Sequence, residues 1–424
     1  MLQVNEITSY KEAFVKRLKI RGIDNGDELL SNVIQLDETR RKTQLQLDEL
    51  LSDLNKTSKL IGGLMKEGKK TEADAAKART SEIKDQTKML NEQLESTKIE
   101  LQNALYNIPN VPHESVPSGN TDEDNEILFT VDSLPELGSN AKPHWDLIKD
   151  YDIIDFDLGV KITGAGFPVY KGKGAKMQRA LINFFLNEAD SAGYLEVQPP
   201  AIVNEASGYG TGQLPDKEGQ MYHLSGSDMY LIPTAEVPLT NIYRDAILDE
   251  KELPIKMTGY TPCFRREAGS WGAHVRGLNR LHQFDKVEII QIQHPDKSYD
   301  TLLDMMKHVE GLLQKLELPY RILRLCGGDL GFTSAITYDF EVYSAAQKRW
   351  LEVSSVSNFE TYQANRLKLR YRNADNKKQL LHTLNGSALA LPRILASILE
   401  NNQTDDGIKV PKALVGFTGF DMIN

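Results

Sequence analysis

Two long stretches of the chain repeat apolar and small residues at alternating spacings of four and three. The first covers residues 29–64 and the second residues 73–108. A sustained period of about 3.5 residues predicts two long helices, each with one apolar seam. The polar run 66–70, with Gly68 at its centre, separates them. Equal lengths around one short turn favour an antiparallel hairpin, although a dimerising coiled coil fits the same pattern.

Each predicted helix of the hairpin would be about 55 Å long at 1.5 Å per residue. Several seam positions carry Thr and one carries Arg, so the seam is weakly apolar and we expect a flexible arm. The first seam consists of Leu29, Val33, Leu36, Arg40, Thr43, Leu47, Leu50, Leu54, Thr57, Ile61 and Leu64. The second consists of Ala73, Ala76, Thr80, Ile83, Thr87, Leu90, Leu94, Thr97, Leu101, Ala104 and Ile108.

Charge is distributed unevenly along this arm. Residues 56–88 hold nine Lys or Arg and five Asp or Glu, whereas residues 27–55 hold three and seven. The half of the arm next to the turn is therefore basic, and a polyanion such as RNA would bind there. A solvated helix face explains the charge alone equally well. The residues that we expect to contact RNA are Lys56, Lys59, Lys66, Lys69, Lys70, Lys77 and Arg79.

After the hairpin, the pattern changes from helical to mixed. Pro109, Pro112 and Pro117 end the second helix, which places a domain boundary between residues 1–110 and 111–424. An amphipathic helix is predicted at 173–191, and strands are predicted at 194–197, 230–232, 287–290, 338–342 and 350–353. Neighbouring strands without helices between them favour an antiparallel sheet and an α+β domain.

Composition narrows the class of protein. The 424 residues have a net charge of −10 and 40% hydrophobic content, which is ordinary for a globular protein and argues against nucleic-acid binding over the whole surface. We expect no membrane span and no secretion signal. Cys263 and Cys326 lie far apart, which indicates a reducing, cytoplasmic location and no cysteine-based zinc site. No GxxxxGK[ST] motif is present, which argues against a P-loop ATPase.

The segment 264–284 carries residue types that a nucleotide requires. Arg265 and Glu267 are two residues apart, and two such residues on a strand point to the same face. A loop containing Gly269, Gly272 and Gly277 follows, and then Phe284. A fixed cation, an acceptor for an amine and an aromatic face suit phosphate and base. Taken alone, the Arg–Glu pair fits a surface ion pair equally well.

Further blocks turn this motif into a family resemblance. In order, they are YGTGQLP at 209–215, YLIPTAEVPLTN at 230–241, YTPCFRREAGS at 260–270, HQFDKVE at 282–288, EVSS at 352–355, and NGS at 385–387 followed by Arg393. This order resembles the class II aminoacyl-tRNA synthetases. The amino-acid sequences of the blocks, together with the N-terminal hairpin, are similar to those of the seryl-tRNA synthetases of bacterial type over essentially the whole chain.

The resemblance implies an α+β fold: a class II antiparallel β-sheet catalytic domain flanked by helices, with an N-terminal antiparallel coiled-coil arm. It implies an enzyme that activates L-serine with ATP to seryl-adenylate and pyrophosphate. Serine then passes to the 3′ end of tRNA(Ser), and to that of tRNA(Sec) where that pathway exists. It also implies a homodimer whose interface lies at residues 174–200, with ATP and Mg²⁺ as cofactors.

For ATP, the resemblance implies that Arg265 and Arg393 are catalytic. Arg265 would contact the α-phosphate and the incoming carboxylate, because its planar fork is always charged. Arg393 would cover the adenine and reach the γ-phosphate. Magnesium would be held by Glu352 and Ser355, since it prefers hard oxygen ligands. The full set of implied ATP contacts is Arg265, Arg266, Glu267, Phe284, Glu352, Val353, Ser354, Ser355 and Arg393.

For the amino acid, the resemblance implies a small polar pocket that discriminates against alanine, because a buried hydroxyl-binding group would be left unpaired. The implied serine contacts are Thr234, Ala235, Glu236, Arg265, Glu288, Asn385 and Ser387. We expect His282 to be structural, because the attacking carboxylate needs no deprotonation. Two other functions fit parts of the chain: a non-catalytic relative of a synthetase, and a ligase that loads a small amino acid onto a carrier protein. The first would lack catalytic residues and the second would lack the arm.

Overall fold

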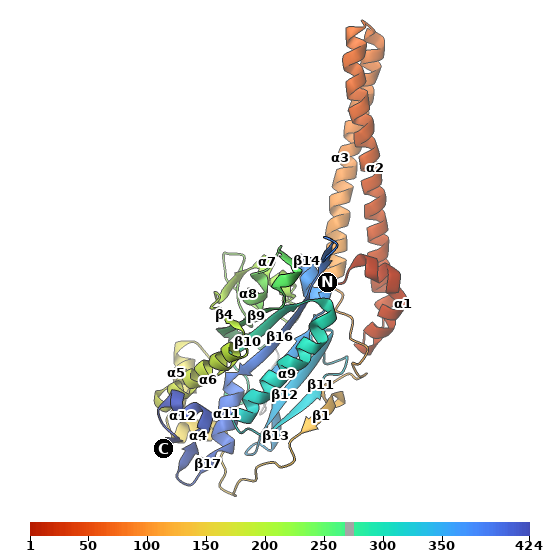
Figure 1. Cartoon of the computed structure of the whole chain (residues 1–424). Coiled ribbons are helices and arrows are strands. Elements are labelled where there is room, and N and C mark those ends of the chain that lie inside the picture. The colour runs from red at the N-terminus through yellow and green to blue at the C-terminus, as the bar shows by residue number, and fades with distance from the viewer. Residues whose placement is uncertain (268–274) are drawn as a thin grey trace. The chain divides into compact units, whose positions relative to one another are not determined.

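The computed structural model describes residues 1–267 and 275–424 of the chain. They form two compact units, one made of Met1–Lys19 and Ile23–Pro109, the other of Ile20–Gly22 and Asn110–Asn424. In Figure 1 the first unit runs from red to light orange and the second from there to blue. The glycine-rich segment around Gly269 and Gly272 lies outside the described residues.

The first unit is helical and confirms the predicted hairpin. Helices α2 (Gly26–Lys66) and α3 (Lys70–Tyr106) lie against each other along their lengths. They are joined at residues 67–69, where Gly68 has a φ of +75°, a conformation that glycine adopts without strain. A shorter helix, α1 (Val4–Ile20), precedes them, and none of the patterns above predicts it.

The seam of the hairpin departs from the predicted register near its start. Leu30 and Asp37 are buried there, whereas Leu29, Leu36 and Arg40 are only half-buried. Asp37 is buried because it accepts hydrogen bonds from its own helix: Arg40 Nε and Arg41 Nε lie 2.9 Å and 2.6 Å from its carboxylate oxygens. From residue 43 onward, most of the buried positions follow the prediction: Thr43, Leu47, Leu64, Ala73, Ala76, Ile83, Thr87, Leu94, Thr97 and Leu101.

The second unit is built on a large sheet, which confirms the α+β prediction. In the described part of the chain, eight strands form this sheet, antiparallel except where β4 meets β9. Their order across the sheet is β1 (Glu126–Thr130), β11 (Tyr320–Arg324), β12 (Ile336–Ser344), β13 (Arg349–Asn358), β16 (His382–Ala390), β10 (Gln283–Gln293), β9 (Ile255–Phe264) and β4 (Leu195–Glu196).

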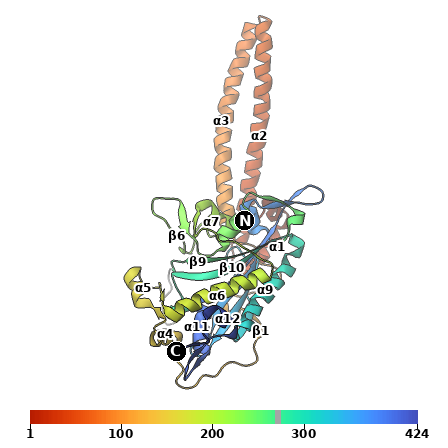
Figure 2. The same cartoon turned by 60° about the vertical axis from the view of Figure 1, so that its left-hand side comes forward.

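Helices α6 (Gly172–Ser191), α9 (Ser298–Lys315) and α11 (Leu391–Asn401) cover one face of this sheet, as the views in Figures 1 and 2 show. Their apolar side chains meet every second residue of the strands, such as Val287 and Ile289 of β10 and Phe340 of β12, in one core. Because side chains alternate along a strand, the residues between these positions point away from the helices.

One predicted strand lies elsewhere. Residues 230 and 231 of the predicted strand 230–232 belong to β7 (Met229–Leu231), which pairs with β5 (Ile202–Asn204) and β6 (Tyr222–His223) in a separate small sheet. The large sheet does not include it, although Phe264 N still donates to the carbonyl of Ile232 at 2.8 Å. The predicted helix 173–191 and the strands within 287–290, 338–342 and 350–353 are confirmed by α6, β10, β12 and β13.

Short elements complete the second unit. The remaining helices are α4 (His144–Asp150), α5 (Phe156–Ile162), α7 (Glu205–Thr211), α8 (Glu236–Asn241), α10 (Thr361–Leu367), α12 (Lys412–Thr418) and the 3₁₀ turns η1 (Asp122–Asp124), η2 (Glu250–Glu252), η4 (Gly277–Asn279) and η5 (Pro295–Lys297). The remaining strands are β2 (Ile154–Asp155), β3 (Val169–Tyr170), β8 (Ile247–Asp249), β14 (Arg370–Arg372), β15 (Lys378–Leu380), β17 (Gln403–Thr404), β18 (Gly407–Lys409) and β19 (Met422–Ile423). Among the residues described, no helix combines the length and apolar character that crossing a membrane requires.

Candidate active site

The strand positions that alternate with the core line a cavity of about 940 Å³ in the second unit. On β10, Lys286 and Glu288 line the cavity, while Val287 between them and Ile289 after them lie in the core. The same alternation places Asn385 and Ser387 of β16, and Asp339 of β12, at the cavity. A polar wall on one face of the sheet is therefore a direct consequence of the period of two along each strand.

One end of the cavity is acidic and deeply buried. Glu236, in the first turn of α8, is 5% exposed. Gln363 Nε2 donates to its Oε1 at 2.6 Å, and Asn385 Nδ2 donates to its Oε2 at 2.8 Å. Burial raises the pKa of Glu236 from 4.5 to about 7, the Gln363 hydrogen bond opposes this, and the nearby charge of Glu288 adds to it. The carboxyl group is thus poised to change its charge when a cation binds.

A second buried carboxylate lies beside the first. Glu288 is 1% exposed; Lys286 Nζ lies 2.5 Å from its Oε2 and the Thr234 hydroxyl donates to the same oxygen at 3.1 Å. Its other oxygen, Oε1, is buried and has no hydrogen-bond partner among the described residues. A buried acceptor of this kind is costly unless a ligand donates to it. This end of the cavity therefore suits a ligand with an ammonium or hydroxyl group.

Arg265 is the cation next to this acidic end. Its Nε donates to the carbonyl of Pro233 at 3.3 Å, and its guanidinium carbon lies 5.2 Å from the ring centre of Phe284. Glu267 forms an ion pair with Arg280. The aromatic ring, the Arg265 guanidinium and this ion pair all line the cavity, which therefore offers stacking, charge and hydrogen-bond acceptors.

Further oxygen ligands line the cavity on β12 and β13. The Ser355 hydroxyl donates to Glu352 Oε1 at 3.4 Å, and Asp339 lies directly opposite Ser355 in the strand pairing. Asp339 Oδ1 is buried without a partner among the described residues, and burial together with Glu352 raises the pKa of its carboxyl group well above the usual value. Arg393 donates to the carbonyl of Glu352 at 2.6 Å.

These oxygens fit a magnesium ion only in part. The described residues contain no group of three or more His, Cys, Asp or Glu side chains arranged to hold a metal. Glu352 and Ser355 supply two hard oxygen donors, and the Glu352 side chain is 49% exposed and accessible. Magnesium takes few protein ligands and completes its octahedron with water and substrate phosphates. The donor set therefore suits an ion that arrives with a polyphosphate.

Comparison with known protein families accounts for both units. Residues 222–402 match the model of the tRNA synthetase class II core domain (G, H, P, S and T), and residues 1–112 match that of the seryl-tRNA synthetase N-terminal domain. The serine--tRNA ligase of Salinibacter ruber is 48% identical over 425 residues, covering 100% of this chain and 99% of the relative. The chain belongs to the seryl-tRNA synthetase family. The Akkermansia muciniphila serine--tRNA ligase is 47% identical, with the same coverage.

Solved structures of seryl-tRNA synthetases have the same fold. The crystal structure of the Pyrococcus horikoshii enzyme, complexed with ATP, matches with a TM-score of 0.92 and 32% identity, covering 100% of this chain and 99% of that one. The cytoplasmic enzyme from Naegleria fowleri, in complex with AMP, matches with a TM-score of 0.86 and 26% identity at the same coverage. Both structures confirm the predicted fold class.

Most residues that the seryl-tRNA synthetase resemblance implied lie together at this cavity. They are Thr234, Glu236, Arg265, Glu267, Phe284, Glu288, Glu352, Val353, Ser354, Ser355, Asn385, Ser387 and Arg393. Ala235 is not among the described lining residues; it is fully buried in a small core with Leu239 and Met257. Arg266 is exposed and also does not line the cavity. Their proposed contacts would have to come from the backbone.

The expectation that Arg265 and Glu267 both sit on a strand is wrong. Strand β9 ends at Phe264, and Glu267 has a φ of +49°, so the chain turns there. Arg265 stays in place because its backbone N–H donates to the carbonyl of His282 at 2.9 Å. Both side chains reach the cavity through this turn. His282 itself is not among the described lining residues; its ring stacks on Phe167 at 5.4 Å.

Several polar residues at the site were missed from the sequence, among them Lys286, Asp339 and Gln363. Lys286 and Asp339 carried a usable signal, because each lies two positions from another lining residue of its strand. Gln363 carried none. It comes from α10, is fully buried, and donates both to the carbonyl of Thr211 at 3.1 Å and to Glu236. Only the folding of distant segments onto one another brings it to the carboxyl group.

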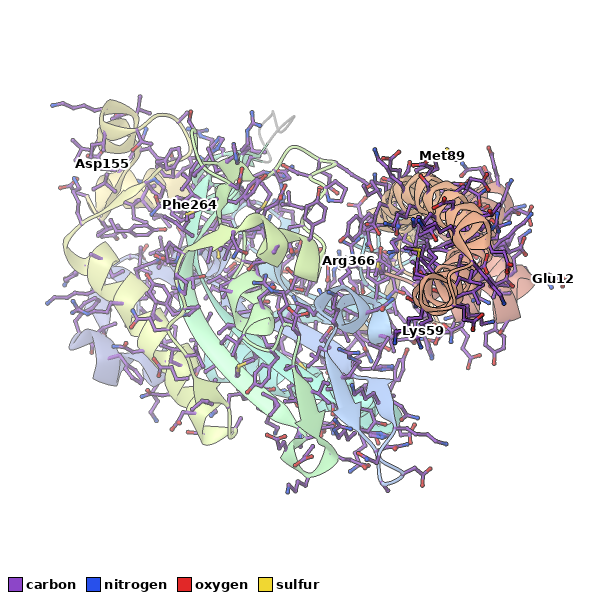
Figure 3. All side chains as sticks on the ribbon, turned by 90° about the horizontal axis from the view of Figure 1, so that it is seen from above. Glu12, Lys59, Met89, Asp155, Phe264 and Arg366 are labelled. Carbon is purple, nitrogen blue, oxygen red and sulfur yellow. The ribbon has the colours of Figure 1, made fainter. Side chains whose placement is uncertain are left out.

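The basic residues predicted for RNA binding lie on the first unit, and all of them are exposed. Figure 3 shows Lys59 on α2 among the side chains that surround the two long helices. Three members of the set form ion pairs: Lys69 with Glu67, Lys77 with Asp74, and Arg79 with Asp53 and Glu82. Those three present less positive charge than the count of basic residues implies.

Proposed function

We propose that this chain is a serine--tRNA ligase, which activates L-serine with ATP to seryl-adenylate and pyrophosphate and then transfers serine to the 3′ end of tRNA(Ser). The observation that carries the proposal is the polarity of the cavity. Two buried carboxyl groups, Glu236 and Glu288, line it together with Arg265 and with the oxygen ligands Glu352 and Ser355 of β13. Such a cavity binds an amino acid by its ammonium group and places its carboxylate towards ATP.

In the activation step, the serine carboxylate attacks the α-phosphate, and these two anions repel each other. Arg265 would contact both, because a guanidinium group offers several donors in a fixed plane. It would thereby stabilise the charge of the transition state, a contribution worth roughly 100-fold or more in rate. Phe284, already stacked against Arg265, would hold one face of the adenine, and Glu267 would accept a hydrogen bond from the adenine amine.

At the pyrophosphate end, Arg393 would bind the γ-phosphate and cover the other face of the adenine. Glu352 and Ser355 would hold Mg²⁺, which supplies positive charge to the phosphate oxygens when it is bound. Val353 and Ser354 lie between Glu352 and Ser355 on β13 and would line the nucleotide site. Pro392 precedes Arg393 in the first turn of α11, a position that proline tolerates because no helical N–H bond is lost there.

Serine selection would rest on the unpartnered oxygen of Glu288 together with Thr234, Asn385 and Ser387. A serine hydroxyl can donate to a buried acceptor, whereas the methyl group of alanine leaves it unpaired. Sites of this kind reject the analogue that lacks the hydroxyl by roughly 10⁴- to 10⁵-fold. Threonine carries the hydroxyl and one more methyl group, so it would have to be excluded by shape.

We propose that the arm binds tRNA(Ser) through its basic half, and tRNA(Sec) where that pathway exists. Support comes from the match of residues 1–112 to the N-terminal domain of the family and from the exposed basic residues around the turn. We also propose that the enzyme acts in the cytoplasm, because that is where tRNA and translation are found.

We propose a homodimer whose interface includes part of the expected segment 174–200. The apolar residues Met177, Leu181 and Phe185 of α6 are buried within the same chain, so they are not accessible to a partner. Exposed apolar side chains lie on the edge strand β4 within that segment, where Leu195 is 66% exposed, and on β5 just after it, where Ile202 is 43% exposed. Light scattering that shows a stable monomer would contradict the dimer.

Serine-dependent exchange of pyrophosphate into ATP is the test of the first step. The exchange should require L-serine, and alanine at equal concentration should give at least about 1,000-fold less exchange. Charging of a tRNA(Ser) transcript tests the second step. An enzyme that exchanges pyrophosphate equally well with alanine or threonine would refute the assignment of serine as the substrate, and an enzyme that never exchanges it would refute the activity.

A further inference from the structure

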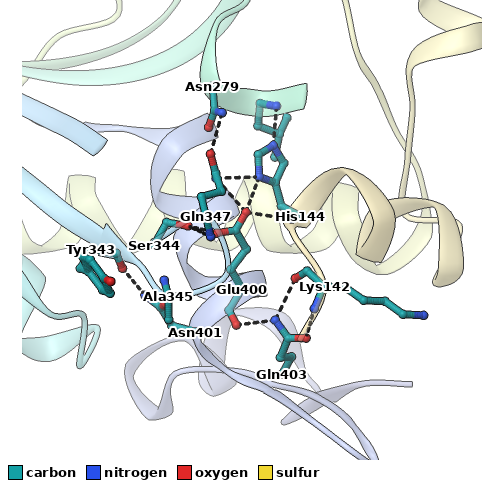
Figure 4. Close-up of polar contacts among 11 residues, drawn as sticks. Lys142, His144, Asn279, Tyr343, Ser344, Ala345, Gln347, Glu400, Asn401 and Gln403 are labelled. Carbon is teal, nitrogen blue, oxygen red and sulfur yellow. Dashed lines mark hydrogen bonds and ion pairs between the residues drawn. The ribbon is translucent and has the colours of Figure 1, made fainter. Parts of the chain in front are cut away.

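Outside the cavity, one acid and one base are completely buried against each other. His144 begins α4 and Glu400 lies near the end of α11; both side chains are 0% exposed, and His144 Nδ1 lies 2.6 Å from Glu400 Oε1 (Figure 4). The same oxygen accepts hydrogen bonds from the backbone N–H of His144 at 2.8 Å and from Gln347 Nε2 at 2.9 Å. The Ser344 hydroxyl donates to the other oxygen. Burial alone would raise the pKa of Glu400, but these hydrogen bonds lower it, so the carboxylate stays ionised.

The hydrogen bonds of His144 define which of its ring nitrogens carries a proton. The backbone N–H of Leu278 points at His144 Nε2, with 2.8 Å between the two nitrogens. A backbone N–H can only donate, so Nε2 must accept and carries no proton. The proton is therefore on Nδ1 and is donated to Glu400. His144 is thus a neutral link between a buried carboxylate and the backbone of residue 278.

Residue 278 belongs to the turn η4, and this turn is also hydrogen-bonded to Arg393, one of the two proposed catalytic arginines. The carbonyl of Asn279 accepts a hydrogen bond from Arg393 Nε at 3.1 Å. The side-chain amide of Asn279 donates to Gln347 Oε1 at 3.0 Å, and Gln347 in turn donates to Glu400. Two routes from Glu400, one through His144 and one through Gln347, therefore converge on the turn that orients Arg393.

The start of α4 also packs closely under this turn. Gly277 has a φ of +65°, and a Cβ atom there would lie 2.3 Å from His144 Nε2. The next residue of the helix, Trp145, holds the guanidinium of Arg276 4.9 Å from its ring centre. Neither His144 nor Glu400 is among the described residues that line the cavity. Their contact with the active site runs through η4.

We propose that His144 and Glu400 are positioning residues for ATP: they fix η4, so that the Asn279 carbonyl holds the Arg393 guanidinium where the pyrophosphate end of ATP binds. The inference rests on the proposed role of Arg393. The proposed serine contacts Glu236, Glu288, Asn385 and Ser387 come from other elements, α8, β10 and β16. Loosening η4 therefore weakens the binding of ATP in the ground state and the transition state, and leaves the binding of serine unchanged.

The test compares two substitutions of one residue. In His144→Gln, the longer side chain can still offer an acceptor where Nε2 was. In His144→Asn, the shorter amide reaches only towards Glu400, so the Leu278 N–H loses its partner. We expect His144→Asn to raise the KM for ATP in pyrophosphate exchange and to lower kcat/KM for ATP by roughly 10- to 100-fold, with the KM for serine within about twofold. His144→Gln should recover most of that loss.

A matched control separates positioning from general stability. His382 is a half-buried histidine that is hydrogen-bonded to Ser298 at 2.7 Å, and it is not among the described cavity residues. His382→Asn should lower the thermal midpoint without raising the KM for ATP. If His144→Asn likewise lowers the midpoint and leaves the KM for ATP unchanged, the positioning role is refuted. If His144→Asn does not fold, the substitution Gln347→Ala, at a half-buried residue, replaces it in this test. A raised KM for ATP would then support the positioning role, and an unchanged KM would refute it.

A second measurement keeps this inference separate from the proposed function. The rise in thermal midpoint on adding ATP and Mg²⁺ requires no serine. If the unaltered protein shows no serine-dependent exchange, the proposed function fails, and the ATP shift still decides the positioning role. A shift that is reduced in His144→Asn and largely restored in His144→Gln supports it. Equal shifts in all three proteins overturn it.

Discussion

Glu236 offers the sharpest quantitative test of the active site. Replacing it by Gln keeps the shape of the side chain and one acceptor oxygen, so one of the two hydrogen bonds from Gln363 and Asn385 is kept, and the ability to ionise is removed. In the folded chain, burial, opposed by Gln363 and assisted by Glu288, raises the pKa of Glu236 from 4.5 to about 7. The unfolded chain retains the ordinary value, so the two states bind different numbers of protons between these pH values.

The sign follows from the raised pKa. Below about pH 4.5 the carboxyl group is protonated in both states, and its contribution to stability is fully present. As the pH rises towards about 7, the unfolded chain gives up the proton first, so the folded state loses stability relative to it. Each unit by which the pKa differs between the folded and the unfolded chain is worth about 1.4 kcal/mol. Between about pH 5 and about pH 8, the free energy of unfolding of Glu236→Gln should therefore rise by about 2.5 kcal/mol relative to that of the unaltered protein.

Urea unfolding across this pH range measures the stability difference, and serine binding measures the same ionisation directly. If the ammonium group of serine binds beside Glu236, it favours the charged form. At about pH 6 the group is roughly 90% protonated, so binding should release close to one proton; at about pH 8 it should release about a tenth of one. Calorimetry in two buffers of different ionisation enthalpy gives this number.

Two outcomes would refute this reasoning about Glu236. One is a stability difference between Glu236→Gln and the unaltered protein that stays constant from about pH 5 to about pH 8. The other is serine binding without proton release near the lower pH. Glu205→Gln is the matched control: Glu205 is also in the first turn of a helix, but it is exposed and is not among the described cavity residues. That variant should follow the unaltered protein at every pH.

Three further predictions follow from the site and the arm. Arg265→Ala should lower pyrophosphate exchange by at least roughly 100-fold with an unchanged thermal midpoint; exchange within tenfold of the unaltered protein would contradict its proposed role. Gly277→Ala should displace the ring of His144 and raise the KM for ATP as His144→Asn does, and a normal KM for ATP would show that η4 tolerates the shift. Neutralising four arm lysines should leave serine activation intact; they are Lys56, Lys59, Lys66 and Lys70. The slope of log K for tRNA binding against log salt concentration should fall by roughly 0.7 to 0.9 per lost phosphate contact. An unchanged slope would show that these lysines do not contact the tRNA.

The sequence determined the features that depend on local periodicity. The hairpin could be predicted from residues 29–108 because a heptad repeat places one apolar row on each helix, whatever else the chain does. The polar wall of the cavity follows in the same way, since alternate residues of a strand face opposite sides. Most of the site residues that the family's sequence blocks implied line the cavity.

Only the tertiary structure decided which distant groups meet and how deeply they are buried. The acidity of Glu236 depends on burial, on Gln363 and on Glu288, and no local pattern connects these residues. The positioning pair His144 and Glu400 lies 256 residues apart in the chain. Local patterns define which face of an element is polar, but pKa values and hydrogen-bond networks depend on the dielectric surroundings and on distances of a few ångströms, which only the packing of elements from different parts of the chain sets.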